Sequence, residues 1–205
     1  MSLKSILSKA LFWHHKHPPI LEVLLEEPKP IVYDTKIINI FGGPGIGKST
    51  VSARLFSELK MMGKDVELVP EYAKDMVWEN RSNILEDQLY IFAKQHRRLK
   101  RLIGKVEYIV TDSPIILGVE YMEEGNFPSL KPLMLEAHES FNNINFMLNR
   151  QTVYNTIGRY HDEDQAKELD DAFTALLTDC EYPFECIDTK DENAHELILN
   201  KLEIQ

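Results

Sequence analysis

Cysteine is scarce in this chain: of its 205 residues, only Cys180 and Cys186 are cysteines. No cluster of His or Cys stands beside them in the sequence, which weighs against a disulfide framework and against a zinc site. We interpret both as free thiols in a reducing compartment, and we therefore expect a cytoplasmic protein.

Long apolar runs are missing as well. No run approaches the roughly 18 residues that a membrane span needs, so we expect no transmembrane segment. The stretch ILSKALFWHHKH near the start is too short, and too interrupted by Lys and His, for a secretory signal.

Positive charge is in deficit, with 23 Lys and Arg against 33 Asp and Glu, which gives a formal net charge of −10. A protein that holds nucleic acid mainly through its phosphates usually needs a basic surface, so this balance weighs against nucleic acid as the main partner. It does not exclude a local basic groove, because residues 94–105 (KQHRRLKRLIGK) are strongly basic while EYMEEGN and HDEDQAKELDD are acidic.

The length is sufficient for one α/β domain with a sizeable core and short for two. Residues 1–34 differ from the rest: apolar residues between positions 3 and 11 fall at helical spacing, and the four prolines of HPPILEVLLEEPKP then prevent a continuous helix. We predict an N-terminal extension (1–34) that packs on a domain formed by residues 35–205. A helix that docks a partner or lies on a membrane surface is the alternative.

From Lys36 onward, segments with strand and helix signals alternate. The strand signals lie in KIINIF, DVELVP, VEYIVTD, INFMLN and FECIDTK, and helical patterns follow each of them. The helix predicted over residues 48–63, for example, carries a regular apolar stripe and ends at Gly63. Five strands separated by helices predict a parallel sheet with helices on both faces.

Glycine is concentrated at one place, since four of the nine glycines lie within residues 42–47. The stretch GGPGIGKS, residues 42–49, fits G-x-x-x-x-G-K-[ST] at every fixed position, after a predicted strand and before a predicted helix. Glycines allow several backbone N–H groups to meet phosphate oxygens, and the helix directs its positive end at the anion. We predict a P-loop NTPase that binds a nucleoside triphosphate with Mg²⁺. The predicted nucleotide-binding residues are Gly43, Gly45, Ile46, Gly47, Lys48, Ser49 and Thr50, with Lys48 at the β/γ-phosphates and Ser49 on the metal.

Two carboxylates follow predicted strands. Asp112 in YIVTDSP stands where a carboxylate can hold Mg²⁺ directly or through water, and the alternative is a helix cap before Pro114. Glu71 in LVPEYAKDMVW directly follows a strand, and ligands of such sheets bind beyond the carboxyl ends of the strands. We predict Glu71 as the base or hydrogen-bond acceptor for a substrate hydroxyl, with Tyr72 beside it on the substrate. A carboxylate that only serves a helix dipole is the alternative for Glu71.

Residues 148–164 (LNRQTVYNTIGRYHDED) predict a lid, in which Arg150 and Arg159 lie around Gly158. Arginines on a mobile lid would stabilise charge on the transferring phosphoryl group and exclude water, so we predict both as catalytic residues. An exposed loop with two solvated arginines is the alternative. A GTPase would need an N-K-x-D-type base reader, and DTKDEN is one residue out of register with that pattern.

Gln88 and Gln95 are seven residues apart in a predicted long helix, so they share one face. Glutamines on such a face can read a base edge through paired hydrogen bonds, and we predict both as substrate contacts. Two half-exposed glutamines without a ligand are the alternative. We interpret the four cations within residues 97–101 as a solvated face rather than as a nucleic-acid stripe.

Taken together, these motifs resemble the nucleoside and nucleotide kinase group of P-loop proteins. The similarity is greatest to the NadR-like AAA family, which includes ribosylnicotinamide kinase domains and many phage ATP-binding proteins. The resemblance covers residues 36 to about 204 and implies a sheet order of 2-3-1-4-5. Deoxynucleoside and thymidylate kinases usually carry Asp-Arg at the third strand, whereas this chain has Asp112-Ser113-Pro114, and this difference leaves the identity of the acceptor open.

The function that these residues favour is transfer of the γ-phosphoryl group of ATP, with Mg²⁺, to a nucleoside, a nucleotide or a related small acceptor. Lys48 and Arg159 would stabilise phosphoryl charge, Ser49 and Asp112 would hold Mg²⁺, and Glu71 would orient or deprotonate the acceptor. A kinase acting on nucleic acid and a non-enzymatic nucleotide sensor are the alternatives. The sequence leaves the oligomeric state and the choice between ATP and GTP open.

Overall fold

The structure, a computed structural model, describes residues 31–122, 127–150, 163–189 and 193–202. The chain divides into two units, Met1–Val32 and Tyr33–Gln205. Only residues 31 and 32 of the first unit are described, so the predicted N-terminal helix lies outside the described residues, and the boundary at residue 34 stays a prediction. In the described ranges, no helix is long and apolar enough to cross a membrane.

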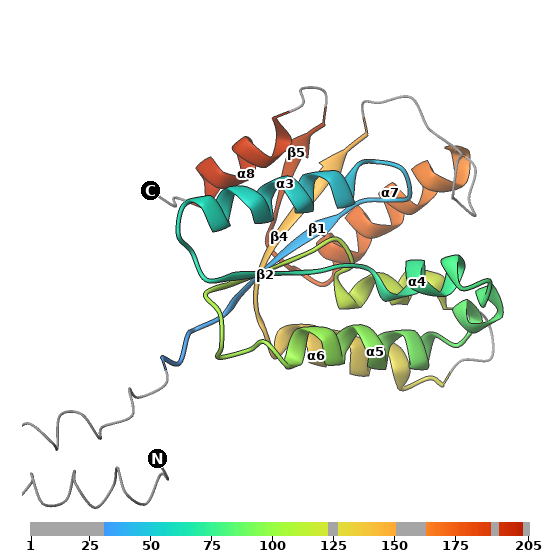
Figure 1. The fold of residues 1–205 in the computed structure, drawn as a ribbon. Helices are drawn as coiled ribbons and strands as arrows, with labels where there is room; N and C mark the ends of the chain where they lie inside the picture. Colours follow the sequence, from blue (N-terminus) through green and yellow to red (C-terminus); the bar gives the residue numbers. More distant parts are fainter. Residues whose placement is uncertain (1–30, 123–126, 151–162, 190–192, 203–205) are drawn as a thin grey trace, which may run out of the picture. The chain divides into compact units, whose positions relative to one another are not determined.

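Five parallel strands form the sheet of the second unit, in the order β2-β3-β1-β4-β5 (Figure 1). Along the chain these strands are β1 (Lys36–Phe41), β2 (Val66–Val69), β3 (Tyr108–Thr111), β4 (Asn142–Asn149) and β5 (Phe184–Asp188). The central strand β1 pairs with β3 and β4, and four of its six residues are buried apolar side chains with no exposed surface: Ile37, Ile38, Ile40 and Phe41. The predicted parallel sheet and its order are confirmed.

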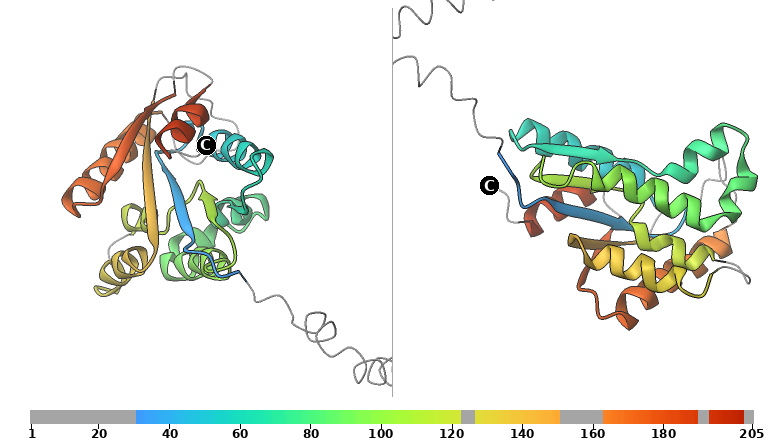
Figure 2. Two further views of the ribbon diagram at one scale, coloured as in Figure 1. Left: turned by 90° about the vertical axis from the view of Figure 1, so that its left-hand side faces the viewer. Right: turned by 90° about the horizontal axis from the view of Figure 1, so that it is seen from below.

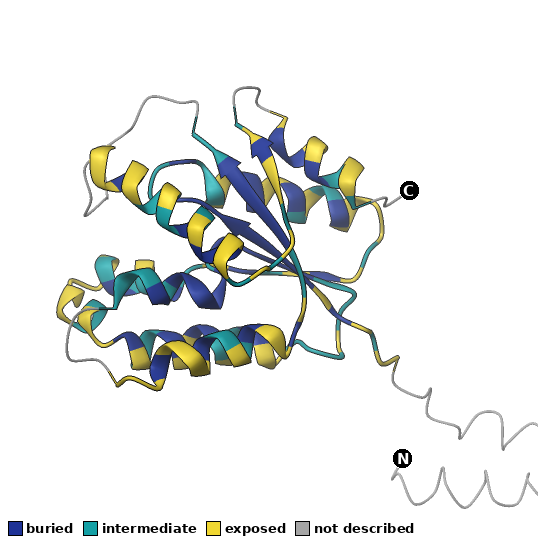
Figure 3. Cartoon of the chain, turned by 180° about the vertical axis from the view of Figure 1, so that it is seen from behind, coloured by how far each residue is buried: buried dark blue, intermediate teal, exposed yellow. Residues whose placement is uncertain are grey.

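Helices cover both faces of this sheet, as predicted (Figure 2). On one face, α3 (Lys48–Met61) and α8 (Ala194–Lys201) pack over a core that includes Ile40 and Leu55. The other face is covered by α5 (Gln88–Lys100), the 3-10 helix η2 (Ile115–Tyr121), α6 (Leu130–Glu139) and α7 (Glu163–Asp179). Figure 3 shows the strands buried between these layers, with exposed residues on the outward faces of the helices.

Two short elements join β2 to the long helix α5, and they bring that helix to the carboxyl end of the sheet. Helix α4 (Tyr72–Trp78) begins directly after β2, and the 3-10 helix η1 (Ser82–Glu86) precedes α5. Helix α5 begins at Gln88 because the Asp87 carboxylate accepts a hydrogen bond from the Tyr90 N–H at 3.0 Å, which caps the helix.

Candidate functional site

The loop between β1 and α3 has the geometry expected for phosphate binding. Gly47 precedes the first residue of α3 with φ 101°, a left-handed conformation that glycine adopts without steric cost, and its carbonyl accepts the Val51 N–H at 3.0 Å. Lys48 opens the helix, and its Nζ donates to the carbonyl oxygens of Gly42 at 2.6 Å and Gly43 at 3.0 Å, so the ammonium group lies over the loop. Ser49 and Thr50 are exposed at the same helix end.

Three ionisable groups from different parts of the chain converge at this loop. Burial lowers the pKa of Lys48, and the negative charges of Glu71, Asp112 and Asp170 raise it. Burial raises the pKa of Glu71 and of Asp112, and the Lys48 ammonium lowers both. The structure thus brings Lys48, Glu71 and Asp112 together at the carboxyl ends of β1, β2 and β3.

A direct hydrogen bond links the two predicted carboxylate positions. The Glu71 N–H donates to Asp112 Oδ1 at 3.0 Å, and Asp112 is only 6% exposed. The Asp112 carboxylate is thus engaged with the loop after β2, and η2, which begins beyond Pro114, has no side-chain cap. Glu71 precedes α4 and makes no side-chain cap there, so its carboxylate is not used to begin that helix.

The donors at this site fit a magnesium ion that arrives with a nucleotide. Among the described residues, no three His, Cys, Asp or Glu side chains gather into a metal-binding cluster, so this part of the chain holds no all-protein cage. Mg²⁺ is usually bound by one or two protein groups together with waters and substrate phosphates. The exposed Ser49 hydroxyl and the Asp112 carboxylate are donors of that kind.

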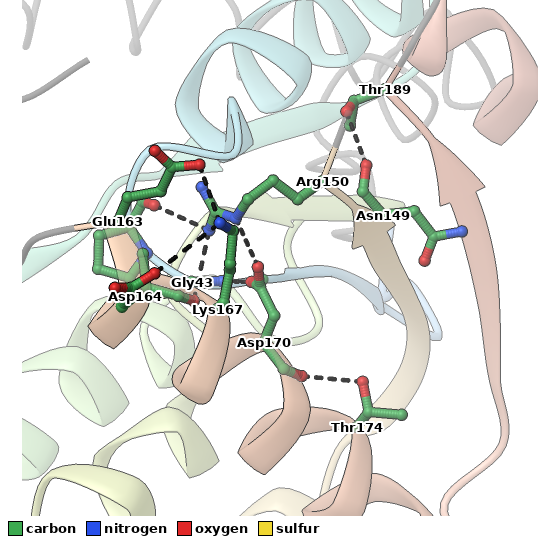
Figure 4. A network of polar contacts seen from close by, with 12 residues as sticks. Gly43, Asn149, Arg150, Glu163, Asp164, Lys167, Asp170, Thr174 and Thr189 are labelled. Carbon is green, nitrogen blue, oxygen red and sulfur yellow. Dashed lines mark hydrogen bonds and ion pairs between the residues drawn. The ribbon is translucent and has the colours of Figure 1, made fainter. Parts of the chain in front are cut away.

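Helix α7 packs directly against the first residues of the loop, and its carboxylate Asp170 was not predicted as a site residue. Arg150, at the end of β4, pairs through Nε with Asp170 Oδ2 at 2.7 Å and donates through Nη2 to Pro44 O at 3.0 Å (Figure 4). The Gly43 N–H donates to the other oxygen of Asp170. A Cβ on Gly43 would lie 2.4 Å from Ala166 O, so only glycine fits there.

These contacts refine the predicted roles of Gly43 and Arg150. The Gly43 N–H donates to Asp170, and the absence of a Cβ at Gly43 lets α7 approach the loop. The nucleotide contact of Gly43 stays a prediction. Arg150 is not a solvated loop residue, because its side chain is only 9% exposed. Its Nε and Nη2 bind Asp170 and Pro44 O, and its contact with a phosphoryl group stays a prediction. Arg159, Gly158 and the body of the predicted lid lie outside the described residues.

A hollow of about 550 Å³ lies between the end of β4 and α7, beside the Arg150–Asp170 pair. Polar and charged side chains predominate in its lining, including Asn149, Lys167 and Asp171.

Tyr121, at the end of η2, is a further residue that was not predicted. Burial and the charges of Glu71 and Asp170 raise the pKa of its hydroxyl, which places Tyr121 in the electrostatic field of the site.

The two glutamines of α5 are both buried, with exposures of 6% for Gln88 and 3% for Gln95, so the half-exposed alternative is wrong. Gln88 Nε2 donates to Leu85 O at 2.6 Å. Both polar atoms of Gln95 are engaged with backbone groups of the protein. The hydroxyl of Tyr72, next to Glu71, donates to that of Tyr90 at 3.0 Å.

The basic segment of α5 is partly engaged with the protein itself. Arg98 pairs with Asp75 at 2.5 Å and lies over the Tyr72 ring, 5.0 Å from its centroid, so the interpretation of residues 97–101 as a uniformly solvated face is wrong at this position. The Lys94 and Lys100 ammonium groups lie 5.1 Å and 5.8 Å from the ring centroids of Tyr90 and Phe141. These contacts do not favour a continuous groove for nucleic acid along α5.

The fold and the loop agree with comparisons to known proteins. A model of a family described as an AAA domain matches residues 37–194. One similar solved structure is a thymidylate kinase from Ehrlichia chaffeensis, with 17% identity and a TM-score of 0.56 over 82% of this chain and 99% of that one. Another is a deoxyadenosine kinase from M. mycoides with bound dCTP, with 19% identity and a TM-score of 0.51 over 81% of this chain and 98% of that one. A NadR protein in complex with NR is similar over 82% of this chain, with 17% identity and a TM-score of 0.60. This chain covers 50% of the length of the NadR chain.

We found no match to the sequence among curated proteins. The identities to solved structures are low, so these likenesses establish the fold and not the substrate. The family match covers most of the chain and includes the P-loop, both carboxylates and the start of α8. The chain therefore belongs to this AAA domain family, and its fold is that of the P-loop nucleoside and nucleotide kinases, with NadR among its structural relatives.

Proposed function

We propose that the protein is a kinase that transfers the γ-phosphoryl group of ATP to a hydroxyl or phosphate of a nucleoside, a nucleotide or a related small acceptor. One observation carries the proposal: a hydrogen bond of 3.0 Å joins the loops of Glu71 and Asp112, and both carboxylates lie near enough to the P-loop lysine, Lys48, for their charges to raise its pKa. A protein that only senses a nucleotide needs the loop and a metal carboxylate. A second half-buried carboxylate beside them suits transfer to an acceptor hydroxyl, which a carboxylate can orient or deprotonate.

The residues divide the work as follows. The backbone N–H groups of residues 45–50 would cradle the phosphates at the positive end of α3, and Lys48 would neutralise charge on the β- and γ-phosphates. Mg²⁺, held by Ser49 and Asp112, would balance the negative charge of the phosphates. Glu71 would accept a hydrogen bond from the acceptor hydroxyl and orient its oxygen toward the phosphorus.

The electrostatics of Glu71 support this role. Burial and the neighbouring Asp112 charge raise the pKa of Glu71, while Lys48 lowers it. A carboxylate with a raised pKa is a stronger base than an exposed one, so it takes a proton more readily from a hydroxyl. The backbone N–H of Glu71 is hydrogen-bonded to Asp112, the proposed metal ligand. The residue that carries the proposed base is therefore linked directly to the residue that would hold the metal.

The test is release of ADP from Mg²⁺-ATP across a panel of acceptors: nucleosides, nucleoside monophosphates, nicotinamide riboside, single-stranded DNA and duplex DNA, with Mg²⁺-GTP as a second donor. We expect stimulation by one small acceptor, loss of that stimulation in Lys48→Ala and Glu71→Gln, and loss in EDTA. Stimulation by DNA alone would replace the proposal with a nucleic-acid kinase. Tight ATP binding without stimulation by any acceptor would contradict the proposal.

A further inference from the structure

A single side-chain amide joins the two loops that carry the carboxylates. Gln95 Oε1 accepts the Tyr72 N–H at 3.0 Å, and Gln95 Nε2 donates to Ser113 O at 3.2 Å and to Pro70 O at 3.4 Å. The side chain comes from α5, which lies elsewhere in the sequence from both loops, and the residue is 3% exposed. The bond to Tyr72 is buried, and the bonds to Ser113 O and Pro70 O are partly buried.

The three backbone groups have a specific relation to the site. Pro70 and Tyr72 stand on either side of Glu71, and Ser113 directly follows Asp112. The amide of Gln95 thus holds the chain before Glu71, the chain after it, and the chain after Asp112. Together with the bond from the Glu71 N–H to Asp112 Oδ1, these contacts close a ring through both loops.

The chemistry of the position needs both a donor and an acceptor. An amide supplies one carbonyl oxygen and two N–H groups, which matches one backbone N–H and two backbone carbonyls. A carboxylate of the same shape would keep the bond from Tyr72 but would have no proton for the two carbonyl oxygens. An apolar side chain would remove the partner of all three backbone groups, which is costly above all for the buried Tyr72 N–H.

A second residue of α5 supports the same loop. Arg98 Nη1 donates to Pro70 O at 3.1 Å, and its Nη2 pairs with Asp75 in the first turn of α4. Pro70 O therefore receives two donors from the same helix, three residues apart. A residue whose amide is committed in this way cannot present the same atoms to a base edge.

We infer that Gln95 is a positioning residue, which fixes Glu71 relative to Asp112 by binding the backbone on both sides of the pair, and that it does not contact the substrate. The meaning of this role rests on the proposed function, because it is Glu71 that would meet the acceptor. The hydrogen bonds themselves can be tested whether or not the protein is a kinase.

The experiment compares Gln95→Met and Gln95→Glu with the wild-type protein by amide hydrogen exchange and by acceptor-dependent ADP release. In Gln95→Met we expect exchange at both Tyr72 and Glu71 to accelerate about tenfold, because each amide then opens more easily. In Gln95→Glu the Tyr72 amide keeps its acceptor and its protection. In both variants kcat should fall about 10- to 100-fold, while KM for ATP stays within about twofold.

Leu99→Ala is the matched control, since Leu99 lies one turn further along α5, is 1% exposed and packs in the core. Leu99→Ala should lower Tm without selectively accelerating amide exchange at Tyr72 and Glu71, and it should leave kcat unchanged. Acceleration at Tyr72 alone, or a rise in KM for the acceptor with kcat unchanged, would overturn the inference. If no acceptor stimulates the wild type, the proposed function fails, and the exchange at Glu71 still decides the positioning role.

Discussion

Removal of the Asp170 carboxylate should destabilise the protein through Arg150. The pair is nearly buried, with 9% of the Arg150 side chain and 14% of the Asp170 side chain exposed, and its N–O distance is 2.7 Å. Removing one member of a buried pair leaves the other charge uncompensated, at a cost of about 3–5 kcal/mol. Asp170 also accepts the Gly43 N–H, which would lose this acceptor. We expect Asp170→Ala to lower the free energy of unfolding by about 3 kcal/mol, near the lower limit because the pair retains some contact with water.

The assay is urea unfolding, with stability taken from the midpoint and the m-value. Asp171→Ala is the control, because Asp171 is the next residue of α7 and is exposed, and it should change stability by no more than about 0.5 kcal/mol. Arg150→Met combined with Asp170→Ala should cost less than the sum of the single changes, with a coupling of about 1–3 kcal/mol. A loss below about 1 kcal/mol in Asp170→Ala, or strict additivity in the double variant, would refute the view that this pair holds α7 on the loop.

Three further predictions concern other parts of the structure. Gly43→Ala should weaken ATP binding at least tenfold by calorimetry, because the added Cβ would lie 2.4 Å from Ala166 O, and an unchanged affinity would count against this packing. Glu71→Gln should lower kcat about 10²–10⁴-fold while the Kd for ATP stays within about twofold, and a matching loss of ATP affinity would point to a binding role instead. His138 is 2% exposed, and burial lowers its pKa from 6.5 to about 4. The folded-state pKa of His138 lies below its unfolded value, so the unfolded chain binds the proton more readily. The stability contributed by neutral His138 is therefore fully present above pH 6.5, and the free energy of unfolding falls by about 3 kcal/mol as the pH falls toward 4. Urea unfolding of His138→Phe should show a flatter pH dependence over that window, and an identical slope would contradict the assignment.

The contacts of Arg150, at the start of the predicted lid, could not be predicted from the sequence. The identity of Arg150 gave no sign that it would pair with Asp170, because the segment around Asp170 is a run of acidic residues in which one carboxylate looks like another. Similarly, the spacing of Gln88 and Gln95 correctly placed them on one helix face, but it could not distinguish an amide that faces a ligand from one that binds the backbone of two loops.

The P-loop and the class of fold could be predicted from the amino-acid sequence. The glycines before Lys48 and the alternation of strands and helices are local patterns, because a phosphate loop and an amphipathic helix each form within one short stretch of chain. Which carboxylates lie at that loop, and what holds them there, depends on long-range contacts of the folded chain. Glu71 comes to Asp112 through the pairing of β2 with β3, Gln95 reaches both loops from α5, and Asp170 reaches Gly43 from α7. Each of these contacts joins residues that are distant in the sequence, so no local periodicity or spacing encodes them.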